Sequence, residues 1–205
     1  MDPLILQKLQ KTLKALISER VLALDDSKQA KQIDISFLAP NSDYVADLGS
    51  SPAINCYLIA INEDRNRRKS ESHRITNNIQ KTHGTLYREP KFVDLSFMIT
   101  VWCKDKQGSA EIENMILGYL LCGLGVFDFM PEDILDRFGI NSKPYGIHFS
   151  LFGNENSDKV TGQIWQAMGS TPKPCLMLSV SVPVAVHEPT HMPIIQEIDR
   201  ITDVK

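Results

Sequence analysis

Hydrophobic and polar residues follow a helical period at the start of the chain and a strand period over much of the rest. Between residues 3 and 24 the apolar side chains recur three or four positions apart, which predicts an amphipathic helix. Later segments alternate residue by residue, as a half-buried strand does, and predict strands over 33–37, 92–103, 147–151 and 176–182. The run 54–61 is apolar on both faces and is expected to lie inside the sheet.

Further helices are expected between these strands. Ser109 suits a helix N-cap, and the predicted buried face of the helix after it consists of Ile112, Met115, Ile116, Tyr119 and Leu120. The nearly apolar run 115–127 is therefore expected to be buried. A short helical turn should follow Pro131. A helix over 157–168 should end at Gly169 and bury Val160, Ile164 and Trp165.

The order of elements indicates the fold class. One helix, three strands, two helices, a strand, a helix and a final strand make an αβββααβαβ chain. Consecutive strands without helices between them predict an α/β (α+β) fold with a mainly antiparallel mixed sheet and helices packed on it. Pro183 at the end of the last strand suits a sheet edge or an exit. We expect one domain over 1–186, followed by a C-terminal tail over 187–205.

Residues 62–90 are polar and charged without a clear period, which predicts a long loop that tends to be functional. Seven basic against three acidic residues give 62–88 a charge of +4, and the net charge of −3 leaves −7 for the rest of the chain. This basic loop, 62–90, is interpreted as a solvated surface or a protein contact. The candidate partner-binding side chains in it are Arg65, Arg67, Arg68 and Arg74.

Nucleic-acid binding by these four arginines is kept as an alternative. The acidic net charge argues against it, because nucleic-acid binding usually uses a broader basic face. Tyr87 is the one aromatic residue of the loop that could stack on a base.

Residues 187–191 read His-Glu-Pro-Thr-His and match the H-E-x-x-H motif of zinc proteases. That motif works within a helix, where its two imidazoles face one metal ion, and Pro189 disfavours a helix at this point. We interpret the match as coincidental and keep a metalloprotease only as the weakest alternative. The sequence holds no G-x-S-x-G, P-loop or G-x-G-x-x-G pattern, so we predict no catalytic residues, cofactor or metal, and no enzyme.

The four cysteines, Cys56, Cys103, Cys122 and Cys175, form no C-x-x-C pair and are expected to be buried free thiols in a reducing compartment. The beginning of the chain lacks the pattern of a signal peptide. The apolar run 115–127 is shorter than the ~20 residues that cross a bilayer. We therefore expect a cytoplasmic protein that does not insert into membranes.

Three segments in order resemble a known family. They are 54–66, a strand that enters an Asp-Arg-Asn turn; 92–102 with the helix after it; and 164–169, followed by Pro172, Lys173, Pro174 and the strand 176–182. Together with the N-terminal helix they resemble the cap, or tail terminator, proteins of contractile injection systems of the antifeeding-prophage type. The resemblance covers roughly 1–186.

The resemblance implies a subunit of a six-fold ring that ends the inner tube and outer sheath of such a particle. Its partners would be copies of itself and the tube and sheath subunits. The tail could lie across a neighbour, with Ile194, Ile195 and Ile198 as its anchor. A terminator of an ordinary phage tail, or another ring of the same particle, is an alternative within the same class.

Overall fold

The computed structural model of the chain describes residues 2–24, 33–67, 72–76, 83–104, 109–151, 157–169, 172–185 and 190–193. For 72–76, 83–88, 157–161 and 191–193 it describes the backbone. Arg68, Ile194, Ile195 and Ile198 therefore lie outside the described residues.

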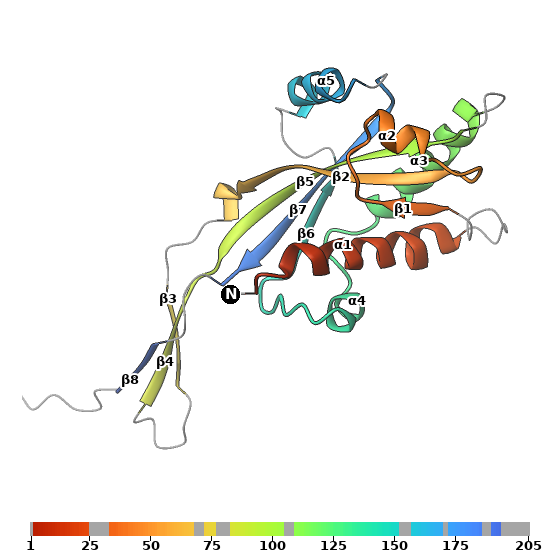
Figure 1. Cartoon of the computed structure of the whole chain (residues 1–205). Helices are drawn as coiled ribbons and strands as arrows, with labels where there is room; N and C mark the ends of the chain where they lie inside the picture. The colour runs from red at the N-terminus through yellow and green to blue at the C-terminus, as the bar shows by residue number, and fades with distance from the viewer. Residues whose placement is uncertain are drawn as a thin grey trace, which may run out of the picture.

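A five-stranded sheet forms the centre of the body (Figure 1). Its strands are β1 (Asp34–Ser36), β2 (Ala53–Glu63), β5 (Lys91–Trp102), β6 (His148–Leu151) and β7 (Cys175–Val184), in the spatial order β1-β2-β5-β7-β6. β1 runs parallel to β2, and every other pairing is antiparallel. The predicted fold class is confirmed, and so is the interior place of the strand that begins near residue 54.

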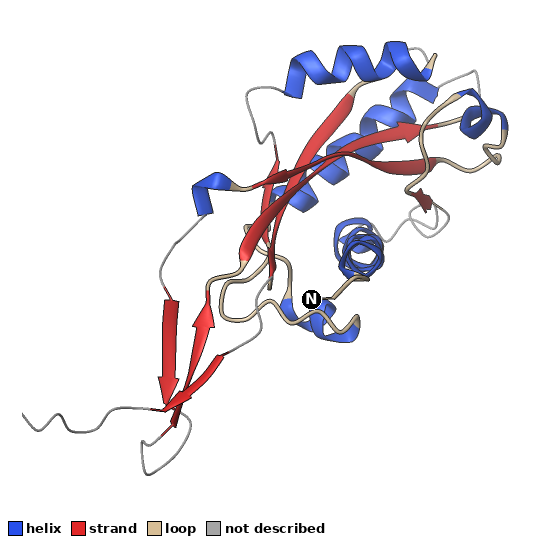
Figure 2. Ribbon diagram, turned by 60° about the vertical axis from the view of Figure 1, so that its left-hand side comes forward, coloured by secondary structure: helices blue, strands red, loops and turns tan. Residues whose placement is uncertain are grey.

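Helices cover both faces of this sheet (Figure 2). One face packs on α1 (Ile5–Leu16, continued by a π turn over Ile17–Val21), α3 (Ser109–Gly125) and α4 (Glu132–Arg137). The other face packs on α2 (Ser42–Ala46) and α5 (Ser157–Met168). β5 supplies both cores by strict alternation: Leu95, Phe97, Ile99 and Val101 enter the larger core, and Met98 and Trp102 the smaller one.

The predicted loop over 62–90 was wrong for much of its length. It contains the hairpin of β3 (Ser72–Thr76) and β4 (His83–Arg88), and β4 also pairs with β8 (Thr190–Pro193) from the end of the chain. These three antiparallel strands form a second sheet, in the order β3-β4-β8, which projects from the body (Figure 1). We call it the arm. Part of the predicted tail is thus a strand of the chain's own arm.

Two further expectations need correction. β7 lies between β5 and β6, so the edge alternative for Pro183 is wrong; Pro183 instead stands at the exit of the strand, beyond Ser181, the last residue that pairs with β6. The short helix α2 was not predicted. It starts at Asn41, whose side-chain oxygen accepts the backbone N–H of Tyr44 at 2.9 Å as an N-cap.

The buried face of α3 differs from the predicted one. Ile116 and Leu120 are buried as expected, together with Glu113, Gly123 and Leu124. Ile112, Met115 and Tyr119 are instead exposed by 37%, 46% and 38%. Gly123 explains why the helix sits this way: a Cβ there would meet Cγ1 of Val21 at 2.5 Å, so only glycine permits this close approach to the N-terminal helix.

Candidate assembly surfaces

The root of the arm is held to the body by a compact polar network. Asp64, at the end of β2, accepts the backbone N–H groups of Asn66 and Arg67 with Oδ1, and the Ser181 hydroxyl with Oδ2 at 2.7 Å. Its own backbone N–H donates to the carbonyl of Phe92 at 2.8 Å. The carboxylate of Asp64 therefore ties the 3₁₀ turn Arg65–Arg67 to β7, and the backbone N–H of the same residue ties it to β5.

Arg67 is the second part of this network. Its guanidinium donates to the Ser181 hydroxyl at 3.2 Å and to the Tyr145 carbonyl at 3.0 Å, and it lies 4.2 Å from the ring centroid of Phe92. Burial lowers the pKa of Arg67, and the nearby Asp64 opposes that shift. The group stays charged at any physiological pH, since the unperturbed value is so high. Arg67 thus fastens the beginning of the arm to the body.

The other end of the hairpin returns beside the same cluster. Glu89 follows β4 directly and is 9% exposed. The pKa of Tyr145 is raised to about 12. Burial is the largest cause, and the hydrogen bond with Glu89 and the charge of Glu89 raise the pKa further. Tyr145 also packs edge-to-face on Phe92, with ring centroids 5.4 Å apart. Both chain segments that enter the arm are therefore tied to one aromatic and polar cluster, which gives the arm a defined root.

The candidate residues of the basic loop thus have different surroundings. Arg65 is exposed in the 3₁₀ turn, Arg67 is bonded within the chain, and Arg74 lies in β3. Arg68 and the three isoleucines of the tail lie outside the described residues. Their partner-binding role stays a prediction. Sequence reasoning missed Asp64 and Ser181 as the residues that hold the turn; the Asp-Arg-Asn motif at 64–66 was the available signal.

A polar groove of about 580 Å³ lies next to this root. The strand register places Asn62, Asp94, Ser181 and His148 in one row across β2, β5, β7 and β6. Asp94 accepts the Ser179 hydroxyl, Asp64 accepts the Ser181 hydroxyl, and His148 packs edge-to-face on Phe129. These bonds join side chains of neighbouring strands along the floor of the groove.

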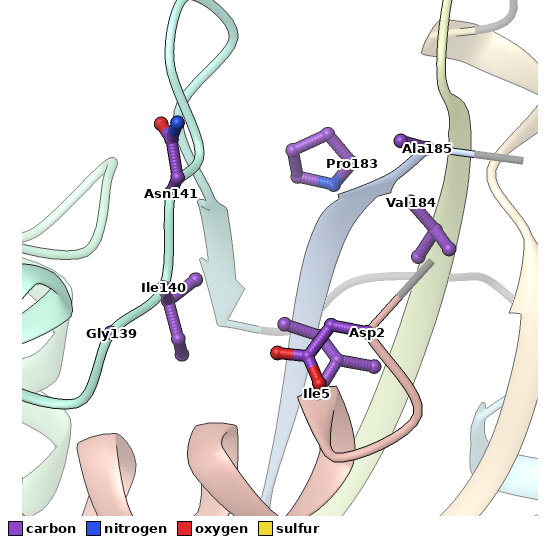
Figure 3. A pocket seen from close by; sticks show the side chains of 8 residues that line it. All are labelled: Asp2, Ile5, Gly139, Ile140, Asn141, Pro183, Val184 and Ala185. Atoms are coloured by element: carbon purple, nitrogen blue, oxygen red, sulfur yellow. The ribbon is translucent and has the colours of Figure 1, made fainter. Parts of the chain in front are cut away.

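A smaller pocket of about 250 Å³ lies between the start of α1, the segment after α4 and the end of β7 (Figure 3). Its lining is mainly apolar, with Ile5, Ile140 and Val184 around it and Asp2 as the single ionisable residue among those that line it. The Asp2 carboxylate is paired with Lys8 at 2.7 Å, and this pairing lowers the pKa of Asp2.

The H-E-x-x-H match does not lie in a helix where the chain is described. His191 is in β8, opposite Thr85 of β4, so its backbone is extended. His187, Glu188 and Pro189 lie outside the described residues. Of the cysteines, Cys56 is buried, and burial raises its pKa to about 12. Cys122 is exposed and Cys103 and Cys175 are half-buried, so the prediction of four buried thiols was wrong. In the described ranges, every helix is too short or too polar to cross a membrane.

Several large apolar side chains of the described body are exposed, among them Leu38, Val45, Ile112 and Met115. Tyr44 of α2 packs edge-to-face on Trp102, and Glu113 of α3 accepts the backbone N–H of Cys103 at 2.9 Å. Both helices are thus attached where β5 ends.

The described chain is an α/β body from which a three-stranded arm projects. The model of the Pvc16 N-terminal domain family matches residues 8–197, so the chain belongs to that family. The family resemblance inferred from the sequence is therefore confirmed.

Two solved structures share the fold. The sheath/tube terminator of the PVC extracellular contractile injection system, in its extended state, matches with a TM-score of 0.61 and 19% identity over 97% of this chain. The tube-terminating cap of the anti-feeding prophage matches with a TM-score of 0.60 and 20% identity over 95% of this chain. The chain spans 64% and 59% of the length of those two proteins. No curated protein matches it.

Proposed function

We propose that this chain is a terminator subunit: six copies form a ring that ends the inner tube and sheath of a contractile injection particle. The observation that carries the proposal is the family match over 8–197, together with two neighbours, a sheath/tube terminator and a tube-terminating cap, that share the fold over nearly the whole chain.

The shape of the molecule supports a ring subunit. A terminator must bind its neighbours sideways and the last layer of the tube or sheath on one side only. The arm projects from one end of the body (Figure 1), as an element that reaches toward a neighbouring copy would. Head-to-tail contacts close into a ring when the rotation between copies fits.

The partners in this proposal are other copies of the chain and the tube and sheath subunits, and the ring assembles in the cytoplasm without catalysis. A terminator of an ordinary phage tail remains the alternative within the same class. The nucleic-acid alternative used four arginines. One of them, Arg67, already donates hydrogen bonds to Ser181 and Tyr145 of the same chain, which weakens that alternative.

The proposal is tested by particle length. Particles assembled with the chain should have a narrow length distribution, and particles assembled without it should show tubes or sheaths of variable length. The purified chain should also be examined by solution mass and negative-stain imaging, where a six-fold ring is expected. Equal length distributions with and without the chain would contradict a terminator role.

A further inference from the structure

α3 carries a row of exposed side chains along the side that faces away from the core. Its buried side packs Ile116, Leu120 and Leu124 into the larger core. Four exposed residues recur on its other side at intervals of three and four positions: Ile112, Met115, Tyr119 and Cys122. Residues three and four apart lie on one face of a helix, so these four form one continuous row. We call it the α3 stripe.

The chemistry of the α3 stripe differs from that of a solvated helix face. Ile112, Met115 and Tyr119 are between 37% and 46% exposed, and residues 114–127 include no charged residue. On its exposed side α1 has the same spacing with polar side chains: Gln7, Lys11, Lys14 and Ser18. An exposed apolar row along a whole helix is typical of a surface that another protein element covers.

Gly118 lets another backbone come close to the middle of the α3 stripe. It lies one turn after Met115 and directly before Tyr119, and a Cβ built on it would have nothing within 4 Å. A glycine on a helix surface permits close approach of a second helix, since no side chain holds the backbones apart. The spacing and the glycine therefore favour a helix as the partner.

The chain itself supplies a helix of this kind, namely α3 of a second copy. Counted from Tyr119, the residues Ile112, Met115, Cys122 and Val126 lie at −7, −4, +3 and +7. Two antiparallel helices with their Tyr119 residues opposite each other thus place Met115 beside Cys122 of the second copy, and Ile112 beside Val126. The stripe is complementary to itself, because both sides of the contact are apolar and uncharged.

The charge at the start of α3 selects the antiparallel arrangement. Glu111 is exposed and precedes the α3 stripe directly. In a parallel pair the two Glu111 carboxylates would face each other at one end of the contact, and like charges that face each other repel. The antiparallel arrangement keeps them at opposite ends.

The size of the contact indicates a weak dimer. A stable interface buries roughly 800 Å² on each partner, and one helix face supplies less than that. The pair should therefore form at high protein concentration and dissociate on dilution. Two-fold pairing through the same surface on both copies is the commonest form of self-association.

We propose that two copies of the chain pair through the α3 stripe, with the two helices antiparallel. The pairing covers the exposed apolar row of both copies. A two-fold contact cannot join neighbours around a six-fold ring, so this inference goes beyond the proposed function. It joins two free chains, or two rings face to face, before they are built into a particle.

The test is disulfide formation in the full chain that carries Met115→Cys. Antiparallel pairing places the introduced thiol beside Cys122 of the other copy, so mild oxidation at high protein concentration should give a covalent dimer. Within one chain the two positions are seven residues, or ~10.5 Å, apart along the helix, which is too far for a disulfide. Mass spectrometry of the digested dimer should identify the link between positions 115 and 122.

Three further variants control this test. Met115→Cys combined with Cys122→Ser should lose the link, because its second thiol is gone. Met115→Cys combined with Val126→Glu should lower the dimer yield about tenfold, since the carboxylate would lie beside Ile112 and near Glu111 of the other copy. Met115→Cys combined with Lys11→Glu, on the exposed side of α1, should leave the yield unchanged.

Several results would overturn the proposal. They are links between two copies of position 115, links between two copies of Cys122, links to another cysteine, and the absence of a covalent dimer. A fourth measurement tests whether the tube or sheath covers the stripe instead. If maleimide modifies Cys122 of the free chain equally fast at every concentration, and Cys122 is protected only in the particle, the partner is a particle subunit and the pairing is wrong.

The outcome separates from the proposed function, because particle length does not enter this test. Particles of controlled length without the link between positions 115 and 122 would overturn the pairing and leave the terminator role standing. The link together with particles of uncontrolled length would do the reverse.

Discussion

The two sheets of this chain are built from the same kind of backbone pairing but differ in what covers them. The five-stranded sheet has helices on both faces, and Phe97, Met98 and Ile99 of its central strand are at most 1% exposed. The arm has three short strands that no helix covers where the chain is described. The body thus has buried cores of its own, whereas the described arm is held by the backbone pairing of its strands.

The largest expected effect is on the free energy of unfolding, and it compares a buried with an exposed side chain of the same helix, α3. Leu120→Ala removes a fully buried side chain of α3 and should lower the free energy of unfolding by about 2–5 kcal/mol. Met115→Ala on the exposed side of the same helix should change it by less than about 0.5 kcal/mol. Urea unfolding of the two variants measures both. Similar losses would mean that α3 is covered on both sides.

A second pair of variants tests the close approach of α3 to the N-terminal helix. Gly123→Ala should destabilise the protein by about 1–2 kcal/mol, because the overlap with Val21 outweighs the gain in helix propensity. Gly118→Ala has nothing within 4 Å of the added Cβ and should stabilise the protein by about 0.5–1 kcal/mol. A stabilising Gly123→Ala would contradict the packing described above.

The root of the arm should matter less to global stability. Arg67→Ala removes the hydrogen bonds to Ser181 and Tyr145 and the contact with Phe92, and should cost about 1–2 kcal/mol. Arg65→Ala, at the exposed end of the same turn, serves as the matched control and should change stability by less than about 0.5 kcal/mol. Thermal unfolding compares the two. Equal effects would mean that the network does not hold the turn.

The smallest effect on the body is expected from loss of β8. A chain that ends after His187 lacks Thr190–Pro193, the third strand of the arm. Its thermal midpoint should stay within about 2 °C of the full chain, because the body core is untouched. Hydrogen exchange in β4 should become faster, since the ladder from β8 is gone. Unchanged exchange in β4 would show that β8 does not protect the hairpin.

The elements with a strong local period were predictable. The alternation of side chains along β5 predicted which residues lie on each face of that strand. The helix Ser157–Met168 was predicted with the same bounds. The arm was not predictable, because β8 pairs with a strand about a hundred residues earlier and neither segment has a marked pattern. α3 has apolar side chains on both its buried and its exposed sides, and periodicity alone did not indicate that Ile112, Met115 and Tyr119 are the exposed ones.

The polar sites show the same limit. Arg65 and Arg67 look alike in the sequence, and only the position of Ser181, 114 residues beyond Arg67, makes one of them part of the body. α2 and the start of α3 lie on opposite faces of the sheet, and both are attached where β5 ends, through Trp102 and Cys103. No local pattern indicates these attachments.

The most direct test of the central claim is to locate the chain in the complete particle by cryo-electron microscopy. The terminator account predicts six copies in one ring at the end of the tube and sheath. Copies distributed along the particle, or particles with a completed end that lacks the chain, would contradict it.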